Sequence, residues 1–152
     1  MTITLEAIEA EQTKVNEMIL AFKKQAATTV FHIAAATITL APGERYAGLV
    51  LGENGEADYH LILLPGDAED VDWEAAGKWA TEHGGVLPNR REQSLLFANL
   101  KSEFQPTYYW SGQQHEEESG WAWYQYFGYG SQDDDREGLA LRARAVRRLI
   151  LQ

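Results

Sequence analysis

The first 25 residues alternate apolar and charged positions with a heptad period. Apolar side chains recur at intervals of three and four residues, and one glutamine completes the series: Leu5, Ile8, Gln12, Val15, Ile19 and Phe22. The intervening positions are mostly charged, which predicts a helix over Leu5–Lys24, roughly 30 Å long, with a narrow apolar stripe. We expect residues 1–27 to form an oligomerisation helix that assembles into a dimer or trimer. The alternative is that the stripe packs on the chain's own domain.

β-Forming residues replace this pattern from Thr28 onwards, and we assign residues 28–152 to one domain. Strands are expected within the segment 28–40, which is rich in β-branched and small apolar residues. Farther along, Asn54-Gly55 separates two apolar runs, Ala47–Leu51 and Tyr59–Leu64. This dipeptide supplies the positive φ values that a tight turn needs, so the pattern predicts a β-hairpin.

Two short helices are predicted in the middle of the chain. Asp72 is a suitable N-cap for a helix that starts at Trp73. The second helix follows Asn89, which forms a capping-box pair with Glu92 three residues later. Both helices are expected to bury an apolar side.

The chain after Pro106 is expected to form three strands, over YYWSG, WAWYQYF and LALRARAVRRLIL. The acidic run Asp133–Asp135 is interpreted as an exposed loop between the last two. Helices that lie between an N-terminal hairpin and C-terminal strands indicate an α+β fold, since no regular βαβ alternation is present.

Side chains in the strand Trp121–Phe127 should alternate between two faces. One face is assigned to a single aromatic core, whose expected members are Trp73, Trp79, Leu87, Trp110, Trp123 and Phe127. The other face carries candidate ligand contacts, because tyrosine suits surfaces that are partly apolar and partly hydrated. These candidates are Tyr124 and Tyr126, with Tyr129 at the next turn, and from the preceding loop Gln113, Gln114 and His115. The alternative is a second buried layer that contains all of the tyrosines.

Composition narrows the chemistry. The formal net charge is −10, which repels phosphate backbones, so we expect no direct nucleic-acid binding. The chain has no cysteine, which excludes thiolate zinc sites, disulfides and cysteine nucleophiles. The histidines form no metal-binding motif, and the run Asp133–Asp135 lacks the spacing of a calcium loop. We therefore expect no metal, no cofactor and no catalytic residue.

The sequence also shows no pattern typical of a secretory signal peptide or a membrane-spanning segment. The N-terminal segment has no basic region followed by an apolar run, and no stretch reaches the length of a membrane span. We expect cytoplasmic synthesis without a signal peptide and no membrane partner. Assembly into a virion remains compatible with this interpretation.

Five short motifs follow one another between Tyr46 and Leu149. They are Trp73-Glu74-Ala75-Ala76, Leu87-Pro88-Asn89-Arg90-Arg91-Glu92, Tyr109-Trp110-Ser111, Ala122-Trp123 with Phe127, and Arg144-Ala145-Val146-Arg147. In this order they resemble the Lcl-like C-terminal domain family of bacterial and phage proteins. The family's usual threonine is Asn89 here, and the cysteine that some members carry near the last strand is absent. The resemblance implies a C-type-lectin-like fold, related to phage tropism determinants, with two short helices and antiparallel strands.

Two functional hypotheses follow. The first is a non-catalytic recognition protein, encoded by a phage or prophage, that presents lectin-like binding surfaces to a glycan or protein ligand from an oligomer. The second is an acidic cytosolic inhibitor that occupies a basic groove of a host protein, an idea motivated by the net charge.

Overall fold

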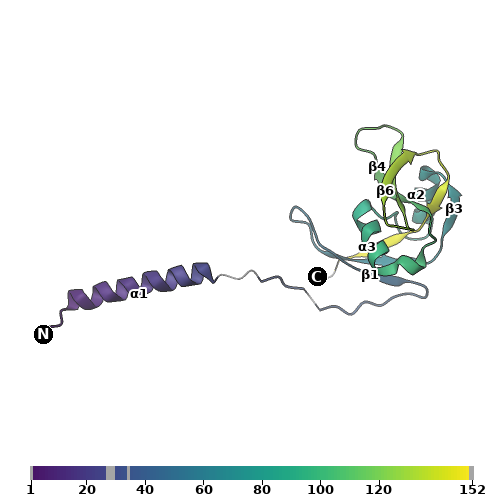
Figure 1. The fold of residues 1–152 in the computed structure, drawn as a ribbon. Helices are drawn as coiled ribbons and strands as arrows, with labels where there is room; N and C mark the ends of the chain where they lie inside the picture. Colours follow the sequence, from purple (N-terminus) through teal and green to yellow (C-terminus); the bar gives the residue numbers. More distant parts are fainter. Residues whose placement is uncertain (1, 27–29, 34, 151–152) are drawn as a thin grey trace. The chain divides into compact units, whose positions relative to one another are not determined.

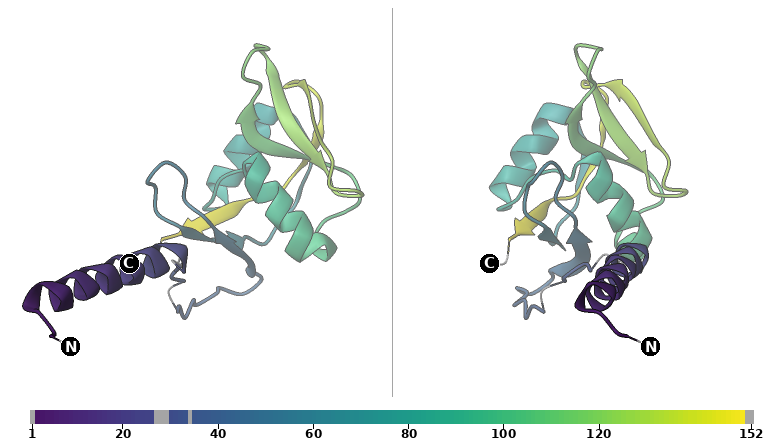
Figure 2. Two further views of the ribbon diagram at one scale, coloured as in Figure 1. Left: turned by 60° about the vertical axis from the view of Figure 1, so that its left-hand side comes forward. Right: turned by 90° about the vertical axis from the view of Figure 1, so that its left-hand side faces the viewer.

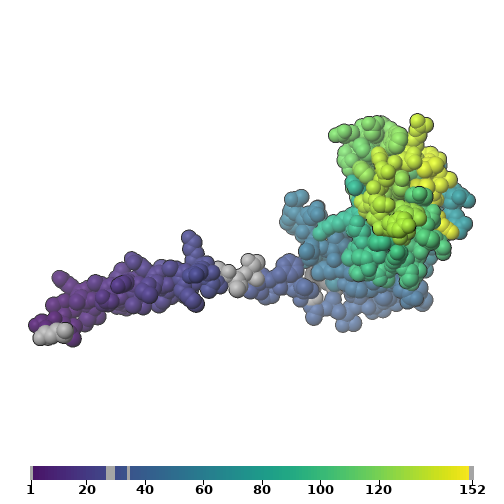
Figure 3. Space-filling model, in the orientation of Figure 1, coloured from purple at the N-terminus to yellow at the C-terminus, as the bar shows by residue number. Residues whose placement is uncertain are grey.

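The computed structural model describes residues 2–26, 30–33 and 35–150. Residues 1–36 and residues 37–152 form separate compact units. In the first unit, helix α1 spans Leu5–Gln25 (Figure 1), which confirms the predicted helix. Thr4 is its N-cap, and the hydroxyl of Thr4 accepts a hydrogen bond from the backbone N–H of Ala7 at 3.2 Å. Every residue of α1 is described and none is buried, and its side chains are exposed along the helix (Figure 3).

The described residues of the segment 28–40 do not form the strands that the sequence analysis predicts. Its described residues, 30–33 and 35–40, belong to neither a helix nor a strand, and residues 28, 29 and 34 lie outside the described part of the chain. A β-strand requires a neighbouring backbone to satisfy its N–H and C=O groups. The described residues of this segment pair with no strand of either sheet.

The predicted hairpin is confirmed in the second unit. β1 (Arg45–Val50) pairs antiparallel with β2 (Tyr59–Leu63), and β2 pairs antiparallel with β8 (Val146–Leu149). Asn54 and Gly55 have φ values of 53° and 83°. They lie within the longer loop 51–58 and do not join the strands directly. The pairing of β2 with β8 brings the two ends of this domain together.

The second sheet within residues 35–150 has the strand order β3-β7-β4-β5-β6. Its members are β3 (Ala68–Val71), β4 (Tyr108–Gln114), β5 (Trp121–Tyr126), β6 (Gln132–Arg136) and β7 (Leu141–Ala143). All of its strand pairs are antiparallel except β4–β7. The described part of the chain therefore has an α+β fold.

Two predictions about the last third of the chain are wrong in detail. Asp133–Asp135 is not a loop, because these residues form most of the edge strand β6 and pair with β5. Aspartate has a low strand propensity. On an edge strand, however, its carboxylate can remain hydrated while the backbone forms hydrogen bonds with the neighbouring strand, and this pairing outweighs the low propensity. The expected final strand is divided into β7 and β8, which belong to different sheets.

Both predicted helices are present. α2 (Trp73–Glu82) begins at Asp72, and α3 (Arg90–Leu100) begins with the capping box formed by Asn89 and Glu92. A 3₁₀ turn, Lys101–Glu103, follows α3. α3 contacts β1 from the first sheet and β4 and β5 from the second, whereas α2 contacts β3, β4 and β7 (Figures 1 and 2).

The expected single aromatic core is wrong, since the described domain has two clusters. The first, which we call the α3 cluster, contains Tyr109, Phe127 and Leu96. The second, which we call the α2 cluster, contains Trp110, Leu87 and Ala76. Side chains alternate along β4, so neighbouring aromatic residues must enter different cores.

The remaining tryptophans of the predicted core are only partly buried. Trp73 and Trp79 pack against the α2 cluster. Trp123 belongs to neither cluster and lies beneath the side chain of Arg90. Trp123 is therefore part of a surface and was wrongly assigned to the core.

Candidate functional site

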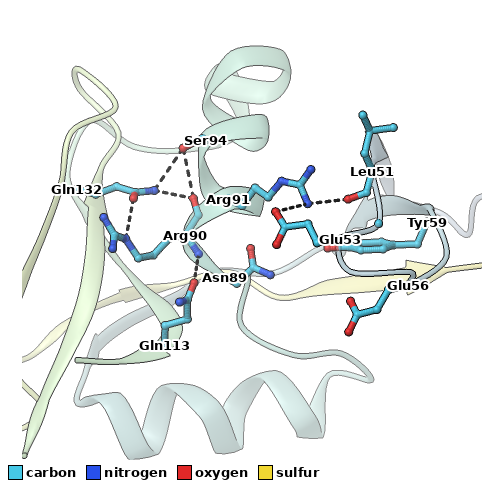
Figure 4. Close-up of a pocket in the computed structure, with 11 residues that line it drawn as sticks. Leu51, Glu53, Glu56, Tyr59, Asn89, Arg90, Arg91, Ser94, Gln113 and Gln132 are labelled. Carbon is cyan, nitrogen blue, oxygen red and sulfur yellow. Dashed lines mark hydrogen bonds and ion pairs between the residues drawn. The ribbon is translucent and has the colours of Figure 1, made fainter. Parts of the chain in front are cut away.

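A polar pocket of about 570 Å³ lies where the loop 51–58, the start of α3, β4 and β6 meet (Figure 4). Two arginines, two carboxylates and several amides line it. Its lining residues are Leu51, Gly52, Glu53, Glu56, Tyr59, Asn89, Arg90, Arg91, Ser94, Gln113 and Gln132. Such a mixture of donors and acceptors suits a polar ligand.

Arg90 is fixed at the side of this pocket by contacts in three directions. Its guanidinium carbon lies 3.6 Å from the ring centroid of Trp123. Its Nε donates to Oε1 of Gln132 at 2.9 Å, and its backbone N–H donates to Oε1 of Gln113 at 2.7 Å. Gln132 in turn donates to the carbonyl of Arg90 at 2.6 Å. These contacts hold the start of α3 against β4 and β6.

The loop 115–120 folds over the same indole. The imidazole of His115 stacks on Trp123 with a centroid distance of 5.4 Å and an interplanar angle of 15°. Its Nδ1 accepts hydrogen bonds from the backbone N–H groups of Glu117 and Glu118 at 3.1 and 2.9 Å. Its Nε2 is 3.4 Å from Oδ2 of Asp134. His115 therefore anchors the loop, which is a structural role.

A buried carboxylate supports the pocket from behind. The side chain of Glu92 has no exposed surface and accepts two hydrogen bonds from Arg148, each at 2.7 Å. It also accepts from the hydroxyl of Tyr59 at 2.8 Å and from the backbone N–H of Asn89 at 2.9 Å. One side chain thus connects β2, β8 and the start of α3.

These contacts shift the acid–base equilibria of the network. Burial raises the pKa of Glu92, but the hydrogen bonds from Arg148, Asn89 and Tyr59 outweigh it and lower the pKa below its ordinary value. Burial and the hydrogen bond to Glu92 raise the pKa of Tyr59 to about 12. At neutral pH, Glu92 is therefore charged and Tyr59 is protonated.

A second surface is formed by aromatic side chains on the opposite side of β5. The tyrosine face consists of Tyr108, Tyr124, Tyr126 and Tyr129. The ring of Tyr108 lies 5.3 Å from that of Tyr124 and 4.9 Å from that of Tyr126, measured between centroids. Tyr129 lies 5.7 Å from Tyr126. Tyr108 is 44% exposed and Tyr129 is 84% exposed.

Carboxylates border the tyrosine face. Asp133 of β6 is the cross-strand partner of Tyr124, and burial together with the charge of Asp133 raises the pKa of Tyr124. On its other side, Tyr108 borders a smaller hollow of about 210 Å³ that Glu69 and Asp70 also line. The surface therefore combines aromatic area with hydrogen-bond acceptors.

The six predicted ligand residues do not form one site. Tyr124, Tyr126 and Tyr129 lie together, whereas Gln113 lines the polar pocket and His115 stacks on Trp123. Gln114 donates to Oε1 of Glu137 at 2.9 Å. The pairing of β4 with β5 shifts register between Trp110 and Gln114, so the end of β4 departs from the simple alternation along the strand.

Sequence reasoning missed Tyr108, Arg90 and Glu92 as members of these surfaces. Tyr108 joins the tyrosine face because it is the cross-strand partner of Tyr126. The capping-box pattern located Glu92, but it gave no sign of Arg148, which is distant in sequence. Among the described residues, no group of three or more His, Asp and Glu side chains could hold a metal ion.

The arginines of β7, β8 and the connection between them pair mainly with carboxylates. Arg142 contacts Glu69 at 2.6 Å and Arg147 contacts Glu44 at 2.7 Å, in addition to the pair of Arg148 with Glu92. Arg144 differs, since it donates to the backbone carbonyl of Leu64 at 2.9 Å. Three of these arginines are therefore engaged in ion pairs within the domain.

No protein-family model and no curated protein sequence matches this chain. Within the described residues, no helix combines the length and the apolar character needed to cross a membrane.

Proposed function

We propose that the protein is a non-catalytic recognition protein whose domain binds its ligand through the tyrosine face. The observation that carries this proposal is the packing of Tyr108, Tyr124, Tyr126 and Tyr129 against one another on the surface of a rigid sheet. Tyrosines of this kind dominate binding energies, because they offer large apolar area, a polar hydroxyl and little conformational entropy to lose. Asp133 at the border adds an acceptor for hydroxyl, amide or cationic groups.

We also propose that the domain has a C-type-lectin-like fold of the Lcl-like group and that the protein is encoded by a phage or prophage. The proposal is supported by the order of the motifs along the sequence and by the way their strands and helices are arranged in the structure. A terminal strand pairs with the first hairpin. Both helices contact β4, and α3 also contacts β5, the antiparallel neighbour of β4. A fold of this group presents its binding surface on the outside of the core, and the tyrosine face has such a position.

Self-association through α1 completes the proposed function. The apolar stripe of α1 is exposed, from 46% at Ile19 to 70% at Leu5. Burial of such a stripe against another copy is favourable, and two or more domains held together bind a multivalent surface more tightly than one. Light scattering of the full chain should give a molar mass of two or three times the 17.1 kDa of one chain. The double variant Ile8→Glu/Ile19→Glu should be monomeric, while the control Ala10→Glu, outside the stripe, should remain associated.

Ligand arrays test recognition itself. Arrays of defined glycans and peptides should be probed with the full chain and with the double variant Tyr108→Ala/Tyr129→Ala. We expect binding of the wild-type protein to a set of related probes and loss of that binding in the variant. A signal that disappears steeply with added salt and survives the tyrosine substitutions would instead support the acidic inhibitor.

A further inference from the structure

Charge is distributed unevenly along α1. Its first half carries Glu6, Glu9 and Glu11 against Lys14, and its second half carries Lys23 and Lys24 against Glu17. No residue of this fully described helix is buried. The N-terminal half is therefore acidic, and the C-terminal end is basic.

The apolar stripe itself fits a partner in either direction. Its spacing of 3, 4, 3, 4, 3 is the same when read from Leu5 to Phe22 or in reverse. In a parallel pair each stripe residue meets its own copy. In an antiparallel pair Leu5 meets Phe22, Ile8 meets Ile19 and Gln12 meets Val15, so the same number of layers is filled.

We infer that α1 associates with a second copy of itself in the antiparallel orientation, an inference that rests on the proposed self-association. A parallel pair would place the acidic halves side by side and the basic ends side by side. The antiparallel pair sets Glu6 beside Lys23 of the other copy and Glu11 beside Lys14, and symmetry makes each contact twice. The opposed helix dipoles favour the same orientation.

Gln12 fits this arrangement and fixes its register. The midpoint of the stripe lies between residues 13 and 14, so the two Gln12 side chains occupy adjacent layers on either side of the symmetry axis. These layers are roughly 4.5 Å apart along the helix, at 1.5 Å per residue, which allows the two amides to hydrogen-bond across the interface. A shift by one heptad would move the two amides into distant layers, where they can no longer hydrogen-bond to each other.

Single cysteines test the orientation cleanly, because the chain has none of its own. Full-length Leu5→Cys and Phe22→Cys variants should each remain unlinked under mild oxidation. An equal mixture of the two should give a disulfide-linked dimer. Ala10→Cys, on the outer side of the helix, is the control that should link in neither case. Homodimers of Leu5→Cys alone would demonstrate the parallel orientation and overturn the inference.

Charge reversal gives an independent readout. Glu6→Lys/Glu11→Lys should weaken the dimer about tenfold, because attractive pairs with Lys14 and Lys23 become repulsive. Adding Lys14→Glu and Lys23→Glu to this variant should restore the dissociation constant to within about threefold of the wild-type value. A stronger dimer in the first variant would contradict the antiparallel pair. A monomeric wild-type protein in light scattering would instead refute self-association as a whole. Failure of the antiparallel orientation and failure of self-association therefore give different results.

Discussion

Replacement of Glu92 by glutamine should destabilise the domain more than any other charge-removing substitution at the polar pocket. The change preserves the size of the side chain but removes the anion that receives both hydrogen bonds from Arg148. The new amide group also presents N–H donors toward Arg148 or Tyr59, both of which are donors in the wild type. The reciprocal cap at the start of α3 is weakened at the same time, because an amide oxygen accepts the hydrogen bond from the Asn89 N–H less strongly than a carboxylate does.

The magnitude follows from burial. Removal of one partner from a buried ion pair costs about 3–5 kcal/mol, since it leaves the other charge uncompensated. Glu92 is fully buried, but the side chain of Arg148 is 39% exposed and can recover part of its hydration. We therefore expect a loss of about 3 kcal/mol, at the lower end of that range.

Urea denaturation of the full chain measures this loss. With a slope of about 1.5 kcal/mol per molar urea, typical of a domain this size, the midpoint should fall by about 2 M. Glu53→Gln is the matched control, because Glu53 pairs with Arg91 at 3.3 Å but its side chain is 67% exposed. It should change the free energy of unfolding by less than about 1 kcal/mol.

A double-mutant cycle tests the physical cause. Arg148→Gln should destabilise the domain by itself, and the combination with Glu92→Gln should cost clearly less than the sum of the two single effects. Additive effects, or a Glu92→Gln midpoint equal to that of Glu53→Gln, would refute the role assigned to this buried pair.

Three further outcomes are expected for other polar and charged groups of the domain as well as for Glu92 and Tyr59. Hydrogen bonds from Arg147 lower the pKa of Glu44, and Glu92 is lowered as described above, so the stability that they confer should be present above about pH 4.3 and decline below it in urea titrations. Burial raises the pKa of both Tyr59 and Tyr109 to about 12. Their contribution should therefore persist to about pH 10 and disappear as the pH rises toward 12, and a late phase of tyrosinate absorbance should shrink when either is changed to phenylalanine. Arg90→Ala should lower the free energy of unfolding by about 1–2 kcal/mol, because it removes the stack on Trp123; no change in the urea midpoint would contradict this role.

Local signals allowed the elements to be predicted. The caps at Asp72 and Asn89 act within three residues, so the starts of α2 and α3 could be identified from sequence alone. The heptad series located α1, and Asn54-Gly55 located the turn region of the hairpin. Each signal depends on neighbours along the chain.

Features set by pairing between distant segments could not be predicted in this way. The acidic segment Asp133–Asp135 becomes a strand only because β5 offers it an edge. Tyr108 joins the tyrosine face through its register with Tyr126, and alternation along β4 divides the aromatic residues between two cores. The candidate site therefore depends on strand register, which the sequence pattern leaves open.

The central claim is that the tyrosine face, rather than the polar pocket, binds the ligand. It is tested most directly by the dissociation constant of the strongest array probe, measured by biolayer interferometry. Tyr129→Ala should weaken binding at least about tenfold without changing the urea midpoint, because its side chain is 84% exposed. Arg91→Ala, in the pocket, should leave the dissociation constant within about twofold. Unchanged binding by Tyr129→Ala together with loss of binding by Arg91→Ala would contradict the account.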